Sequence, residues 1–73
     1  MVSRLKKISG KECIKILCRR FGFKIIRQHG SHVVLRKDNI GTVVPNHKEL
    51  KIGTLKGILR LVKVSEDEFA KES

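Results

Sequence analysis

Two of the three histidines in this 73-residue chain flank a Gly-Ser pair, in the segment RQHGSHVVL of residues 27–35. The third, His47, lies shortly after, in the segment VVPNHK. Imidazole is the side chain whose charge changes between pH 5 and 8, so it serves as a metal ligand and as a proton donor or acceptor. Three interpretations follow: a metal site, a catalytic site, or polar residues at a strand end without a chemical role.

A metal site would need His29 and His32 to approach across a tight hairpin, with His47 joining them. Structural zinc sites use four ligands and catalytic ones three, and cysteines or carboxylates usually complete the set. No acidic residue flanks these histidines, and both cysteines fall within a helical pattern. We therefore expect no metal and no other cofactor.

A catalytic histidine suits RNA, because RNA carries its own nucleophile in the ribose 2′-hydroxyl. A general base beside that hydroxyl contributes roughly 10²–10⁴ in rate. Positive charge around the scissile phosphate stabilises the transition state further. The sequence shows no paired carboxylates of the kind that hold two metal ions, which argues against the two-metal route. The residue pattern alone leaves open the third interpretation, a histidine tolerated at a strand end.

Charge is the strongest compositional feature. The chain has 17 Lys and Arg against 7 Asp and Glu, a net charge of +10, with +13 in residues 1–64 and −3 in residues 65–73. A field this strong works against compactness and indicates a polyanionic partner, nucleic acid before an anionic membrane or an acidic protein. Three Phe and no Trp or Tyr argue against a platform for base stacking.

A chain of this length forms one small domain with a radius of gyration of roughly 11 Å, so a site is expected on the surface or in a shallow groove. No apolar run approaches the ~20 residues that span a bilayer. The first ten residues, MVSRLKKISG, lack the apolar segment of a secretory signal. Cys13 and Cys18 are about 140° apart around a helix, which excludes a disulfide between them and predicts buried, reduced thiols. The expected location is the cytoplasm.

The first half of the chain predicts one helix and then three strands. Ser9 and Glu12 form a capping box that begins a helix over about 10–20. Its apolar stripe consists of Cys13, Ile14, Leu17, Cys18 and Phe21. Strands are expected over about 23–28, 32–37 and 42–44, with turns at Gly30-Ser31 and at residues 38–41.

The second half predicts two helices after a polar connection over 46–52. Leu55, Ile58, Leu59 and Val62 mark a helix over about 54–63. Gly57 lies in its middle at a cost of ~1 kcal/mol, which suggests close packing or a close ligand. Ser65 and Glu68 form a second capping box, and a short helix over about 66–71 follows with Phe69 as its apolar anchor.

The predicted fold is a single α+β domain over 1–73, a two-layer α-β-β-β-α sandwich with an extra short C-terminal helix. Its element order matches that of the double-stranded-RNA-binding domain, which is an analogy of topology. The buried face of the sheet stays open at this point. If the length of the first turn changes by one residue, Ile26 lies opposite Leu35 in place of Phe23 and Ile25.

Four landmarks in this order resemble the HicA-type (YcfA-like) mRNA interferase toxins. The first is Gly22-Phe23 entering a strand, followed by Arg27 and Gly30-Ser31-His32. The others are Val44-Pro45-x-His47, then Leu50-Lys51-x-Gly53-Thr54-Leu55 with Ile58, and finally Ser65-x-x-Glu68-Phe69. The resemblance covers about Ser9 to Phe69.

The resemblance implies a dsRNA-binding-like fold and the toxin of a type II toxin–antitoxin pair, an endoribonuclease that cleaves mRNA and is neutralised by a HicB-like antitoxin. No membrane partner is expected. The active histidine of the Gly-Ser-His element is His32 here, His47 has a secondary role, and His29 is interpreted as an ordinary turn residue. Residues expected to contact RNA are Arg27, Gly30, Ser31, Arg36, His47, Lys48, Lys51, Thr54 and Lys56.

The chain departs from the family pattern in the strand after His32. This strand reads Val-Val-Leu, without the aromatic residue often found there. The change bears on contact with RNA or antitoxin rather than on the chemistry. The alternative function is a non-catalytic RNA-binding module of the same fold.

Overall fold

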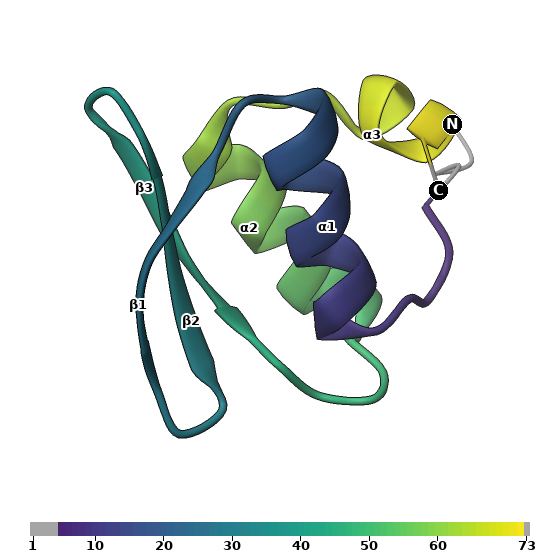
Figure 1. The fold of residues 1–73 in the computed structure, drawn as a ribbon. Coiled ribbons are helices and arrows are strands. Elements are labelled where there is room, and N and C mark those ends of the chain that lie inside the picture. Colours follow the sequence, from purple (N-terminus) through teal and green to yellow (C-terminus); the bar gives the residue numbers. More distant parts are fainter. Residues whose placement is uncertain (1–4, 73) are drawn as a thin grey trace.

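The computed structural model describes residues 5–72, so the expected domain range of 1–73 extends past the described residues at both ends. Helix α1 is followed by three strands, β1, β2 and β3, and then by helices α2 and α3 (Figure 1). This order is the predicted α-β-β-β-α arrangement with its extra C-terminal helix. The bounds are Gly10–Arg20 for α1, Lys24–His29 for β1, His32–Lys37 for β2, Ile40–Pro45 for β3, Ile52–Val62 for α2 and Glu66–Glu72 for α3.

Helix α1 begins and ends where the sequence pattern predicts. The Ser9 hydroxyl accepts a hydrogen bond from the Glu12 amide at 3.0 Å, and Gly22, at φ +77°, turns the chain out of the helix toward β1. The apolar stripe differs from the prediction in one position. Ile16 is buried with Cys13 and Leu17, and the predicted members Ile14, Cys18 and Phe21 are only partly buried. The stripe is wider than predicted because both the sheet and α3 cover this helix.

The three strands form one antiparallel sheet in the order β1-β2-β3. Val33 pairs with Val44 and Leu35 pairs with Thr42, and these four residues are buried beneath the helices. The register therefore answers the question that the sequence left open: Leu35 lies opposite Ile25, not Ile26. Because side chains alternate along a strand, His32, Val34 and Arg36 lie on the opposite, uncovered face.

Strand β3 is longer than predicted, 40–45 instead of 42–44, and the turn before it is correspondingly shorter. Lys37 pairs with Ile40, so only Asp38 and Asn39 remain in the turn. Asp38 has φ +52°, and its carbonyl accepts a hydrogen bond from Arg36 Nε at 3.0 Å. An aspartate tolerates this left-handed conformation, so the turn needs only two residues and Ile40 can pair in the sheet.

Strand β1 spans 24–29, one residue later than predicted at each end, and all six of its residues are exposed. A β-bulge lies between Ile25 and Arg27, so that Ile26 is an extra residue relative to β2. Ile25 remains 57% exposed and Ile26 53% exposed, because the helices pack mainly over β3.

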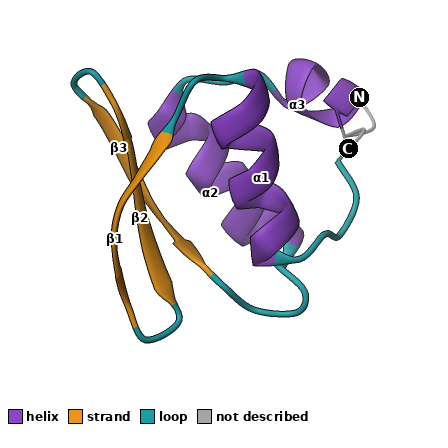
Figure 2. Cartoon of the chain, in the orientation of Figure 1, coloured by secondary structure: helices purple, strands orange, loops and turns teal. Residues whose placement is uncertain are grey.

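Both long helices cover one face of the sheet and leave the other face open (Figure 2). Helix α2 begins at Ile52, two residues before its predicted start, and ends at Val62, one residue before its predicted end; the next residue, the C-cap Lys63, has φ +58°. Its buried residues are the four predicted ones, Leu55, Ile58, Leu59 and Val62. Close packing at Gly57 was a wrong expectation, because a Cβ added there would meet no atom within 4 Å.

Helix α3 begins with the second predicted cap, in which the Ser65 hydroxyl accepts from the Glu68 amide at 3.1 Å. Phe69 is buried and packs with the core formed by α1, α2 and the sheet. In the part of the chain that the structure describes, no helix is long and apolar enough to cross a membrane.

Candidate active site

The Gly-Ser pair forms the two-residue turn between β1 and β2. Gly30 has φ +57°, and this positive φ falls on the first central residue, where a type II′ hairpin turn requires it. The Gln28 side-chain amide donates to the Gly30 carbonyl at 3.0 Å and braces the turn. The sequence predicted this turn correctly, and its tight geometry fixes which residues stand opposite one another in the two strands.

His32 is the first residue of β2, and it pairs directly with His29, the last residue of β1. Both side chains are exposed, and both lie on the open face of the sheet, because directly paired residues share a face. The interpretation of His29 as a turn residue is therefore wrong. The turn has only two residues, so His29 belongs to the strand and stands beside His32.

The other neighbour of His32 across the sheet is Pro45, at the end of β3. One residue further on, the Asn46 amide donates a hydrogen bond to the Ser31 carbonyl. The loop after β3 is thereby bound to the turn that precedes His32. The strand end that carries His32 is held on both sides, by β1 and by the chain after β3.

Helix α1 holds the same loop from the opposite side. The Gly10 amide donates to the His47 carbonyl at 2.8 Å, and the Leu50 amide donates to the Ile8 carbonyl at 2.7 Å. A Cβ on residue 10 would lie 1.9 Å from the Pro45 carbonyl oxygen, so the contact requires glycine. The loop that contains His47 is therefore placed by long-range contacts and not by its own sequence alone.

His47 itself is exposed and lies between two shallow hollows at the starts of the long helices. One hollow is also lined by Lys48, together with Ser9 and Lys11 at the start of α1. The other is also lined by Lys51 and Thr54, at the start of α2. The structure thus brings four of the predicted RNA-binding residues together, and this group lies beside the end of β3 next to His32.

The predicted arginines occupy two places on the open face of the sheet. Arg27 pairs with Val34, two residues before His29 on β1, so it lies near the histidine pair. Arg36 lies four residues along β2 from His32, about 13 Å away at the usual rise of a strand. Lys56 is partly buried on α2 and does not line either hollow beside His47. Arg36 and Lys56 are therefore peripheral to the histidines.

Sequence reasoning missed two residues on the open face, Lys24 and Ile26. They line a shallow hollow together with Gly22, Arg36, Lys37 and Asp38. Lys24 pairs with Arg36 across the sheet, which extends the line of cations away from the histidines. The bulge determines on which face Ile26 lies, and no residue in β1 signals that bulge in the sequence.

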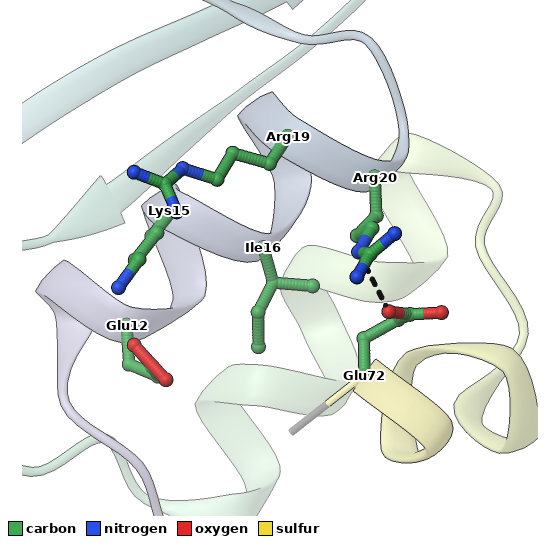
Figure 3. A pocket seen from close by; sticks show the side chains of 6 residues that line it. All are labelled: Glu12, Lys15, Ile16, Arg19, Arg20 and Glu72. Carbon is green, nitrogen blue, oxygen red and sulfur yellow. Dashed lines mark ion pairs between the residues drawn. The ribbon is translucent and has the colours of Figure 1, made fainter.

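A hollow larger than the two beside His47 lies elsewhere, between α1 and α3. Glu12, Lys15, Ile16, Arg19, Arg20 and Glu72 line it, and Arg20 Nε lies 2.9 Å from Glu72 Oε1 (Figure 3). None of the three histidines contributes to it. The ion pair between the two helices accounts for two of the five charged side chains that line this hollow.

Among residues 5–72, no three His, Cys, Asp or Glu side chains come together in a way that could hold a metal ion. The three-histidine site weighed from the sequence does not form, because His47 lies at the helix starts whereas His29 and His32 share the open face of the sheet. The cysteines also stay apart from the site. Both are free, with Cys13 buried and Cys18 half-buried in α1.

A comparison with protein families matches residues 10–64 to the model described as the HicA toxin of bacterial toxin–antitoxin systems. The chain belongs to the HicA toxin family. The match includes the whole of the candidate site, from the start of α1 to the end of α2, and leaves out α3. Comparison with curated proteins and with solved structures finds no further match.

Membership of the HicA family gives this chain the role of a toxin that acts with a cognate antitoxin. The Gly-Ser-His turn, the Pro45–His47 segment and the start of α2 all lie within the matched residues. These are the elements that the fold gathers around one end of the sheet.

Proposed function

We propose that this HicA toxin is a metal-independent endoribonuclease that cleaves mRNA in the cytoplasm, with His32 as the general base. The observation that carries the proposal is the position of His32. It stands exposed at a strand end that is fixed by the turn, by β1 and by the loop after β3. A catalytic base must be held in one place while remaining accessible, and this position combines both properties.

The proposed reaction begins when His32 takes the proton of a ribose 2′-hydroxyl. The 2′-oxygen forms a bond to phosphorus, and the bond from phosphorus to the 5′-oxygen breaks. The products are a 2′,3′-cyclic phosphate and a 5′-hydroxyl. RNA supplies the nucleophile itself, so the reaction requires no metal-bound water.

Cations around His32 support an RNA substrate. Arg27 lies on the same face of the sheet, and Lys48 and Lys51 lie on the loop before α2. The N-cap of α2 is Lys51, whose side chain makes no capping hydrogen bond, so the first amides of that helix are available to a phosphate near Thr54. An RNA strand that crosses His32 would be held by charge on both sides of the scissile bond.

The same open face suits a HicB-like antitoxin. Ile26 is 53% exposed and Val43 is 45% exposed, and Lys24, Arg27 and Arg36 lie around them. An antitoxin that covers this surface would bury apolar side chains against the two exposed residues and place carboxylates opposite the cations. Inhibition would then follow from exclusion of RNA.

Replacing the base tests the proposed chemistry. His32→Ala and His32→Gln should keep the fold, because the side chain is exposed, and should lower the rate of RNA cleavage by roughly 10²–10⁴-fold. Cleavage of a long single-stranded RNA is followed on gels, and the product ends are identified by mass spectrometry. Lys71→Gln, an exposed cation on α3, serves as the matched control.

Three results would contradict the proposal. Wild-type cleavage by His32→Ala would remove His32 as the base. A 3′-hydroxyl product would exclude attack by the 2′-hydroxyl, and inhibition by EDTA would indicate a metal. Salt-sensitive RNA binding without any cleavage by the wild type would instead identify a non-catalytic RNA-binding module.

A further inference from the structure

The pairing of His29 with His32 is a feature of the site that the catalytic interpretation of the sequence did not use. The two residues flank a two-residue turn and stand directly opposite one another on the open face. Residues in such a pair have Cβ atoms about 4.5–5.5 Å apart. Two imidazoles attached this close together can reach one phosphodiester group from two sides.

We infer that His29 is a second catalytic residue, the general acid that protonates the departing 5′-oxygen. The inference rests on the proposed function, because it assigns the proton donor for the same cleavage. Cleavage by 2′-hydroxyl attack expels a 5′-alkoxide, which is a poor leaving group unless it receives a proton. A general acid positioned at that oxygen increases the cleavage rate by roughly 10²–10⁴-fold, as much as the general base does.

The protons balance across the two imidazoles. His32 starts neutral and accepts the proton of the 2′-hydroxyl as the 2′-oxygen bonds to phosphorus. His29 starts as the imidazolium and gives its proton to the 5′-oxygen as the phosphorus–oxygen bond breaks. The reaction ends with His32 protonated and His29 neutral, and exchange with water restores both.

Among the described histidines, only His29 shares a face with His32. His47 lines hollows beside the starts of α1 and α2, with Ser9, Lys11, Lys51 and Thr54 as neighbours. Its backbone carbonyl accepts from the Gly10 amide, which anchors it on the helical side of the sheet end. His47 is therefore placed to contact the RNA backbone rather than to serve as the partner of His32.

The charged group nearest to the pair on β1 is Arg27, two residues before His29 on the same face. Along β2 the next is Arg36, four residues from His32, and on the loop after β3 the first titratable side chain is that of His47. Pro45, opposite His32 on β3, carries no charge. Arg27, the nearest of these cations along β1 on the same face, is placed to bind the phosphate that lies between the two rings.

A substrate with a better leaving group tests the assignment. A cleavage site is first mapped on a long single-stranded RNA with the wild type, and a short RNA is then made around it with sulfur in place of the bridging 5′-oxygen. The thiolate leaves without a proton, so an acid contributes little to its departure. His29→Gln should lower cleavage of ordinary RNA by roughly 10²–10⁴-fold and cleave the sulfur-containing RNA at close to the wild-type rate.

His32→Ala should lose activity on both substrates, because the 2′-hydroxyl needs its base in each. The pH profile gives an independent measure: wild-type activity should fall at low pH, as the base becomes protonated, and at high pH, as the acid loses its proton. In His29→Gln, activity should no longer fall at high pH, because the acid that causes this fall is absent. Lys71→Gln is again the control, and circular dichroism checks that every variant is folded.

The two proposals fail in different ways. If the wild type does not cleave RNA, the proposed function is wrong. If the wild type cleaves but His29→Gln matches it on ordinary RNA, only the assignment of His29 is overturned. Equal losses on both substrates would also overturn it, because they would give His29 a structural role without proton transfer.

Discussion

At the scale of single residues, the two cysteines differ in how far the fold removes them from water. Cys13 is fully buried, and burial raises the pKa of its thiol from 9.0 to about 12. Cys18 is half-buried on the same helix, and burial raises its pKa as well. Since the thiolate is the reactive form, burial protects both groups, and Cys13 more strongly.

Alkylation should therefore distinguish the two thiols. With iodoacetamide at pH 8, Cys18 should be modified first, and Cys13 should react only as the domain unfolds. Mass spectrometry of peptides over time measures both rates, with the urea-unfolded chain as the control. Equal rates in the folded protein would contradict the burial of Cys13.

The raised pKa of Cys13 also links stability to pH. The unfolded thiol loses its proton above about pH 9, whereas the folded thiol keeps it up to about pH 12. This contribution to stability is complete below pH 9 and is lost as pH rises from 9 toward 12. Urea unfolding between pH 7 and pH 10 should show the beginning of that loss.

Residue types alone predicted the turn at Gly30-Ser31, because glycine readily adopts a positive φ. The catalytic role of His32 follows from the resemblance to the HicA toxins and stays a prediction. Residue types suggested that His29 approaches His32 only as part of a metal site, and they could not establish that the two residues face each other. That relation depends on the register of two strands, and the register depends on whether the turn has two residues or three. A change of one residue would have placed the two imidazoles on opposite faces.

At the scale of elements, two helix glycines have opposite surroundings. A Cβ on Gly10 would lie 1.9 Å from the Pro45 carbonyl oxygen, whereas a Cβ on Gly57 would meet nothing within 4 Å. Gly10 therefore permits α1 to lie against the end of β3. Gly57 only lowers the intrinsic stability of α2.

Alanine at these positions should change stability in opposite directions. Gly57→Ala should stabilise the domain by about 1 kcal/mol, the difference in helix propensity. Gly10→Ala should destabilise it by about 1–3 kcal/mol, because backbone must move to admit the methyl group. Urea unfolding measures both, and a stabilising Gly10→Ala would contradict the contact with Pro45.

The helix predictions were accurate wherever a local signal marks an end. Ser9 and Ser65 cap their helices as the capping boxes indicate. The start of α2 was misplaced because Lys51 is an N-cap without a capping side chain, so the sequence gives no mark there. Strand β3 was predicted too short because Asp38 adopts a left-handed conformation that shortens the turn. The presence of an aspartate in the sequence does not indicate this conformation.

At the scale of the whole molecule, charge is divided between two regions. Residues 1–64 carry +13 and residues 65–73 carry −3, and Arg20 pairs with Glu72 where α1 meets α3. The composition predicted a polyanionic partner, but only the fold shows that Lys24, Arg27 and Arg36 share the open face with His32. The acidic segment forms α3, on the helical side of the molecule (Figure 1).

This division predicts the salt dependence of RNA binding. In a His32→Ala background, which leaves the RNA uncut, the logarithm of the binding constant should fall linearly with the logarithm of salt concentration. Arg27→Gln should reduce that slope by about 0.7, the value for one phosphate contact on a single strand. Lys71→Gln should leave the slope unchanged, and an unchanged slope with Arg27→Gln would show that this arginine does not contact RNA.

Strand β1 lies at the edge of the sheet, and its outer backbone groups face away from β2. An edge of this kind invites a second copy of the chain to add a strand, and repeated addition leads to aggregates. The bulge beside Ile26 and the charges of Lys24 and Arg27 are the devices by which natural sheets prevent such growth. The cations proposed to hold RNA would thus also oppose the addition of a second chain at this edge, so variants that neutralise them should aggregate more readily than the unmodified toxin.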